Sequence, residues 1–174
     1  MDSLTSYNPT TYDAPLRHTM LEVHQRLLSL YCALIVAEQL TYERIHGRIG
    51  STDELIQLLL RDPWFTWLSP LLDLLLRIDQ LLTDDAFDIT HENVAHLVAE
   101  VRNLTHPSIE GDGFERAYYE ALRRAPDVLH AHFHVTRALQ TEAASIIRRR
   151  YRKTVVGLSV NERHQNNQPA TVGN

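Results

Sequence analysis

Four ionisable residues interrupt stripes of the sequence that are otherwise apolar: His24, Glu38, Asp79 and His132. If the segments that carry them fold as antiparallel helices, Asp79 comes near the level of His24. His132 then lies about 30 Å along the last segment, near the same level, at 1.5 Å per residue. We favour a hydrogen-bonded polar core here, and the alternative is a mononuclear transition-metal site or a pH-sensitive switch formed by His24, Asp79 and His132. Glu38 needs another partner, and Arg61 is near its level.

Further histidines stand at spacings that metal sites use. Glu43 and His46, and likewise Asp127 and His130, are three residues apart, as in the carboxylate–histidine pairs of two-metal helical bundles. Both pairs fall near helix ends and off the main apolar stripes, which argues against a dry two-metal cage. His130 and His134 are one helical turn apart and together offer two nitrogens to Zn²⁺, Ni²⁺ or Cu²⁺. Because that face is opposite the core stripe, we favour an incidental pair.

A short basic segment lies near the C-terminal end of the sequence. It carries five positive charges and no negative one, whereas the whole chain has a net charge of −5. Its residues are Arg148, Arg149, Arg150, Tyr151, Arg152 and Lys153. We favour a solvated helix end whose cations meet the helix dipole, and the alternative is a contact site for an anionic partner, RNA or a membrane surface. The acidic remainder argues against duplex nucleic-acid binding, which needs a broad basic face.

Motifs for other chemistry are missing from the sequence. There is no glycine-rich phosphate loop, and no serine or cysteine has a base at an informative spacing. The one cysteine, Cys32, excludes a disulfide framework within the chain and a cysteine-based zinc site, which favours a reducing, cytoplasmic setting. The N-terminal residues do not have the pattern of a secretory signal. Asp73 and Arg77 interrupt the leucine-rich run, so we expect no membrane span.

The elements that position these residues are predicted to be helices. Apolar residues recur at spacings of three and four over most of the chain, and strand signals are nearly absent. The expected helices cover residues 16–46, 52–82, 90–105 and 113 to about 150. We therefore predict an all-α protein with the up-down-up-down topology of a four-helix bundle. Residues 1–14 are expected to form a flexible arm, residues 15–153 one helical-bundle domain, and residues 154–174 a disordered tail.

Capping signals and prolines divide these helices. Asp62 is expected to cap a helix whose first position is Pro63, and Pro70 repeats this pattern, which predicts a jointed second arm. Thr90 is the expected N-cap of the third helix. Pro126 is expected to kink or interrupt the last arm.

The segment Asp62-Pro-Trp-Phe-Thr-Trp-Leu68, together with GDGFERAYYEALRRAPDVLHAH downstream, resembles a family of small bacterial all-helical proteins. The resemblance covers most of residues 16–140. It implies a soluble helical fold in a bacterial cytoplasm and transfers no activity.

The breadth of the apolar surface indicates a function. The first two long helices each carry two apolar stripes, which is more than the interior of a four-helix bundle must bury. We therefore expect a non-catalytic association or scaffold module, with a second copy of the chain as its partner in a homodimer and another protein as a possible further partner. The alternative is a metal-binding helical protein with storage, sensing or oxidase chemistry, which would use inward His and Asp residues and a transition metal.

Overall fold

The computed structural model describes residues 10–84, 89–111 and 113–141. Within these ranges the protein is helical and contains no strand, which confirms the all-α prediction. The elements are α1 (Thr10–His46), α2 (Thr52–Arg61), the 3₁₀ helix η1 (Pro63–Leu68), α3 (Ser69–Thr83), α4 (His91–Leu104) and α5 (Phe114–Arg124). A further helical stretch covers residues 126–141. The expected tail and the basic segment Arg148–Lys153 lie outside the described residues.

The longest element, α1, has 37 residues and forms the centre of the molecule. Its first apolar stripe is buried along its whole length, as its spacing indicates. These residues are Leu16, Met20, Val23, Leu27, Leu30, Leu34 and Ala37. The helix begins at Thr10, ahead of the start expected near Pro15, and includes this proline. Pro15 lies beyond the first turn of α1, where a proline removes one backbone donor and its ring crowds the carbonyl four residues earlier.

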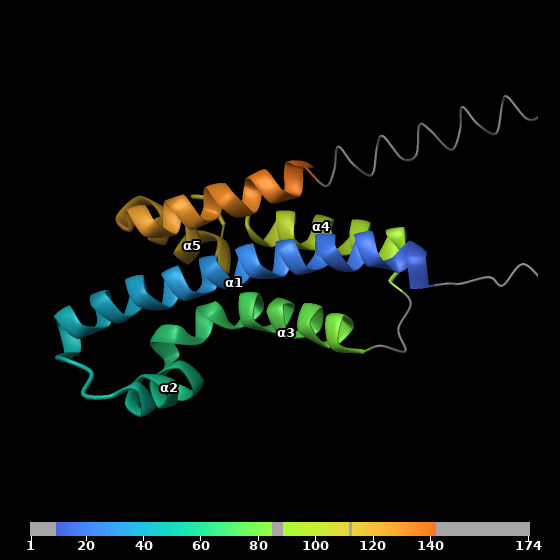
Figure 1. Cartoon of the computed structure of the whole chain (residues 1–174). Helices are drawn as coiled ribbons and strands as arrows, with labels where there is room; N and C mark the ends of the chain where they lie inside the picture. The colour runs from blue at the N-terminus through green and yellow to red at the C-terminus, as the bar shows by residue number, and fades with distance from the viewer. Residues whose placement is uncertain (1–9, 85–88, 112, 142–174) are drawn as a thin grey trace, which may run out of the picture.

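Figure 1 shows how the other elements surround α1. Helix α3 runs back along one side of α1, and α4 and the stretch over residues 126–141 lie on another side. Both α3 and α4 contact α1, and so do η1 and α5. The core where they meet is formed mainly by leucine and valine, together with Phe65 of η1 and the fully buried Tyr118 of α5.

Local capping explains where several elements begin. The side chain of Ser51 accepts a hydrogen bond from the Glu54 amide at the start of α2. Asp62 Oδ1 accepts from the Trp64 amide at 2.8 Å, and Pro63 follows it in the first turn of η1. Leu68 occupies the N-cap position of α3 without a side-chain capping hydrogen bond, so the pattern expected to repeat at Pro70 lacks its polar cap. Residues 52–83 are therefore divided into three consecutive elements.

The second half of the chain has equally clear boundaries. Thr90 and Asn93 form a capping box at the start of α4. Ala125 is extended and ends α5, and the next helical stretch begins at Pro126, so this proline separates two helices. Arg17 of α1 donates hydrogen bonds to the Leu82 carbonyl at 3.1 Å and to the Asp84 carbonyl at 3.2 Å. The beginning of α1 is thereby attached to the C-terminal end of α3.

Candidate association surface

An exposed apolar stripe lies on α1, on the side away from its buried stripe. Leu21, Leu28, Val36 and Leu40 are 43–54% exposed, and Cys32 is also exposed. Successive members are four or seven residues apart, a spacing that keeps them on one face of a helix. The sequence predicted a second apolar stripe on α1 that includes Leu21 and Leu28. The structure leaves these two leucines exposed, because the other helices cover the opposite side.

A cleft of about 370 Å³ opens beside this stripe, where α5 ends and the stretch over residues 126–141 begins. Its walls are mostly apolar, and Arg44, Arg124 and Asp127 bring charges to it. The apolar and neutral residues that line it are Cys32, Ala33, Val36, Ala37, Leu40, Ala125 and Pro126. The stripe is therefore continuous with a shallow apolar recess that contains charged groups of both signs.

A buried carboxylate holds the backbone behind this surface in place. Glu38 is 5% exposed, accepts a hydrogen bond from Trp64 Nε1 at 3.0 Å and forms an ion pair with Arg124. These contacts join α1 to η1 and to the end of α5. Arg61, the partner expected from its level along the helices, is exposed at the end of α2. Arg124 is the last residue of α5, and this helix ends beside Glu38.

Aromatic rings extend this junction to the end of α1. The Tyr42 hydroxyl donates to Asp62 Oδ2 at 3.4 Å, and its ring lies 4.4 Å from that of His46 and 5.9 Å from that of Trp64. Glu43, the other half of the expected Glu–His pair, accepts from the Ile49 amide at 3.3 Å and also from Gln39. This pair therefore stabilises the end of a helix.

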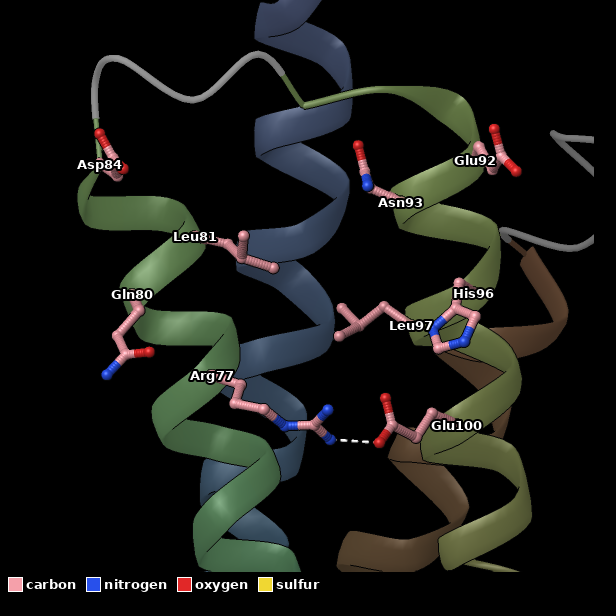
Figure 2. Close-up of a pocket in the computed structure, with 9 residues that line it drawn as sticks. All are labelled: Arg77, Gln80, Leu81, Asp84, Glu92, Asn93, His96, Leu97 and Glu100. Carbon is pink, nitrogen blue, oxygen red and sulfur yellow. Dashed lines mark hydrogen bonds and ion pairs between the residues drawn. The ribbon is translucent and has the colours of Figure 1, made fainter.

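A second groove, of about 650 Å³, lies between α3 and α4. Figure 2 shows Leu81 and Leu97 pointing toward each other across it, with α1 behind. An ion pair between Arg77 and Glu100 crosses one end. Gln80, Asp84, Glu92, Asn93 and His96 complete the lining. This groove is more polar than the α1 stripe and lies over a different pair of helices.

The three residues considered for a metal site do not converge. Asp79 is exposed, because α3 turns its neighbour Ile78 into the core, and His24 is half-buried on α1. His132 Nδ1 lies 2.8 Å from the Tyr118 hydroxyl, and its Nε2 lies 3.4 Å from the Thr136 hydroxyl. Within the described ranges, no three or more His, Cys, Asp or Glu residues are placed to hold a metal ion together.

Tyr118 and His132 instead form a polar contact at the edge of the core. Burial raises the pKa of the Tyr118 phenol above its ordinary value and lowers the pKa of His132. Both shifts favour the neutral forms, which share a hydrogen bond without burying a charge. The polar-core interpretation thus applies to His132, with Tyr118 as a partner that the sequence analysis did not identify.

One described helix has the length and composition to cross a membrane. It is α1 over Ala14–His46, and 33% of its most apolar stretch is buried in this fold. The core helix of a soluble protein has the same length and composition, so these two properties alone do not identify a span. Asp73 and Arg77, the basis for expecting no span, lie in the shorter leucine-rich run of α3.

Comparison with protein-family models, with curated proteins and with solved structures gives no match for this chain, so the family resemblance remains a prediction.

Proposed function

We propose that the protein is a non-catalytic association module, built as a four-helix bundle, that forms a homodimer in the bacterial cytoplasm through the exposed face of α1. The observation that supports this proposal is the exposed stripe with Cys32 near its middle. Apolar side chains on one helix face gain free energy when a second apolar face excludes water from them. An identical face on a second copy provides such a surface through a two-fold axis.

Charge supports an antiparallel arrangement of the two α1 helices. With the two-fold axis near Cys32, Leu28 of one copy lies opposite Val36 of the partner subunit. Glu22 then lies on the same flank as Arg44 of the partner subunit, and both residues are exposed in the single chain. A parallel arrangement would instead place Glu22 at the level of its own counterpart and far along the helix from Arg44 of the partner subunit, so it lacks this pairing of opposite charges. The antiparallel pair therefore combines apolar contacts at its centre with opposite charges at its ends.

The two α1 faces supply more than half of the surface that such an interface needs. Helix α1 ends at His46, so with the two-fold axis near Cys32 residues 18–46 of the two copies overlap. At 1.5 Å per residue and a width of about 10–12 Å, this face covers roughly 500 Å². A standard interface buries about 800 Å² on each partner. The cleft beside the stripe and the charged residues that line it would supply the remainder.

Sedimentation equilibrium of the full chain tests the proposal. The wild-type protein is expected to have the mass of a dimer at micromolar concentration, and Leu28→Glu/Val36→Glu that of a monomer with unchanged helical circular dichroism. Leu76→Glu is the matched control, because Leu76 is 52% exposed on α3, away from the stripe, and its replacement should leave the dimer intact. A monomeric wild-type protein, or a double variant that remains dimeric, would contradict the proposal.

A further inference from the structure

Two histidine rings face each other on the helical stretch over residues 126–141. His130 and His134 are one turn apart, and their Nε2 atoms are 3.0 Å apart. The rings are nearly perpendicular, at 76°, with their centroids 4.5 Å apart. Without a metal, one neutral ring donates a hydrogen bond to the other. This contact is exposed to solvent, so a metal ion can reach both ring nitrogens.

The separation of these nitrogens is within the reach of one metal ion. With metal–nitrogen bonds of about 2.0–2.1 Å, two imidazoles have their nitrogens about 2.8–3.0 Å apart at a right angle and about 3.3–3.4 Å apart at a tetrahedral angle. The 3.0 Å between the two Nε2 atoms is the length of the hydrogen bond that joins them, so a small movement of either ring accommodates a shared ion. Nitrogen ligands bind Cu²⁺ more tightly than Ni²⁺ or Zn²⁺.

The charges around the pair set limits on its binding strength. Partial burial, followed by the charges of His130, Arg26 and Arg137, lowers the pKa of His134. Imidazole binds metals in its neutral form, so this environment keeps a ligand available at neutral pH. The two arginines also repel a divalent cation. Because no third protein ligand is present among the described residues, water would complete the coordination sphere.

The geometry points to a two-histidine site at His130 and His134 that binds Cu²⁺ more tightly than Ni²⁺ or Zn²⁺. The two nitrogen ligands give this preference, because the affinity of such ligands for first-row divalent ions is highest for Cu²⁺. The site lies on a different helix from the α1 stripe, so it does not depend on the proposed dimer. A metal ion bound here would stabilise one turn of the helical stretch over residues 126–141.

Titration calorimetry with CuCl₂, NiCl₂ and ZnCl₂ tests the site on the full chain. The chain has ten histidines, so the comparison between variants is decisive. We expect His130→Ala and His134→Ala each to bind one Cu²⁺ fewer than wild type, or to bind it at least tenfold more weakly. His106→Ala is the matched control, because His106 is exposed in the loop after α4, and it should bind as wild type does.

Electron paramagnetic resonance of the Cu²⁺-loaded wild-type protein gives a second test that does not depend on how a variant folds. We expect nitrogen couplings from two imidazoles at one copper in wild type, and from at most one in either alanine variant. Equal copper stoichiometry and affinity in wild type and in both variants would overturn the site. So would a wild-type copper spectrum without two imidazole couplings.

Discussion

At the scale of residues, the most informative side chain is Glu38. A carboxylate with 5% exposure is tolerated in an apolar interior only when hydrogen bonds and an opposite charge compensate for its lost hydration. Trp64 and Arg124 provide this compensation from two other elements. Glu38 therefore fixes how α1, η1 and α5 lie relative to each other, next to the proposed association surface.

Removing Arg124 is expected to destabilise the protein. Arg124→Ala leaves the Glu38 carboxylate without its cation, and the expected loss in free energy of unfolding is about 1–3 kcal/mol, below the value for a fully buried pair. This reduction reflects the 35% exposure of the Arg124 side chain. Urea unfolding of wild type and Arg124→Ala measures this loss in free energy. Arg77→Ala is the control, since Arg77 pairs with Glu100 at the surface, and we expect it to lose less than about 1 kcal/mol. Equal losses in the two variants would refute a structural role for Glu38.

Tyr118 predicts how stability responds to alkaline pH. Its pKa is raised in the folded protein, so above the ordinary tyrosine pKa of about 10 the unfolded chain loses the phenol proton first. The contribution of the protonated Tyr118 phenol to stability is therefore complete below that pH. As the pH rises further, the free energy of unfolding falls by up to about 1.4 kcal/mol per pH unit.

Unfolding measured between pH 9 and 11.5 tests this response. Tyr118→Phe should be less stable than wild type at pH 9, because it lacks the contact with His132, but should lose less stability as pH rises. Tyr119→Phe serves as the control and should retain the wild-type slope. An unchanged slope in Tyr118→Phe would show that this phenol does not carry the effect.

The sequence indicated which residues are unusual, but it did not identify their partners. The spacing of the apolar residues was enough to identify the polar residues that interrupt the apolar stripes, such as Glu38 and His132. The partner of Glu38 is 86 residues away, and estimates based on helix levels placed Arg61 there instead. Asp79 shows the same difficulty. It belongs to the second apolar stripe predicted for residues 52–82, but whether such a stripe is buried depends on how the neighbouring helices pack, and Asp79 is exposed.

At the scale of elements, short-range signals determined several of the boundaries. Asp62 and Thr90 each accept a hydrogen bond from a backbone amide at the start of the following helix, as their residue types predicted. Ser51 makes the same kind of contact at the start of α2. These contacts span only two or three residues, so sequence alone is sufficient. The start of α1 at Thr10 was predicted less well, because proline favours the first turn of a helix, whereas α1 extends from Pro15 back to Thr10.

Asp62 makes a testable contribution at the joint between α2 and η1. Asp62→Ala removes the acceptor for the Trp64 amide and for the Tyr42 hydroxyl, and we expect a loss of about 1–2 kcal/mol in free energy of unfolding. Asp53→Ala is a suitable control because Asp53 is an exposed acidic residue in the first turn of α2, and its loss should stay below about 1 kcal/mol. Thermal and urea unfolding both report the difference. A loss no larger than that of the control would mean that the cap does not stabilise the joint.

At the scale of the whole molecule, α1 has two contrasting sides. One side is buried by the remaining helices, and the other carries four large aliphatic side chains that are about half exposed. The sequence predicted surplus apolar surface, and the structure places part of that surplus on the outer face of α1. The proposed dimer follows from this asymmetry, because a second copy supplies a matching face and the opposite charges at its ends.

Cross-linking through Cys32 tests this proposal most directly. Cys32 is the one cysteine of the chain, and packed helices have axes about 8–10 Å apart, so a two-fold axis near Cys32 places both thiols within reach of a short bis-maleimide. At low micromolar concentration, we predict a covalent dimer of the wild-type protein, linked from Cys32 to Cys32. The Leu28→Glu/Val36→Glu protein should remain monomeric under the same conditions. Wild-type protein that is recovered only as a monomer, with its thiol modified but not linked, would contradict association through α1.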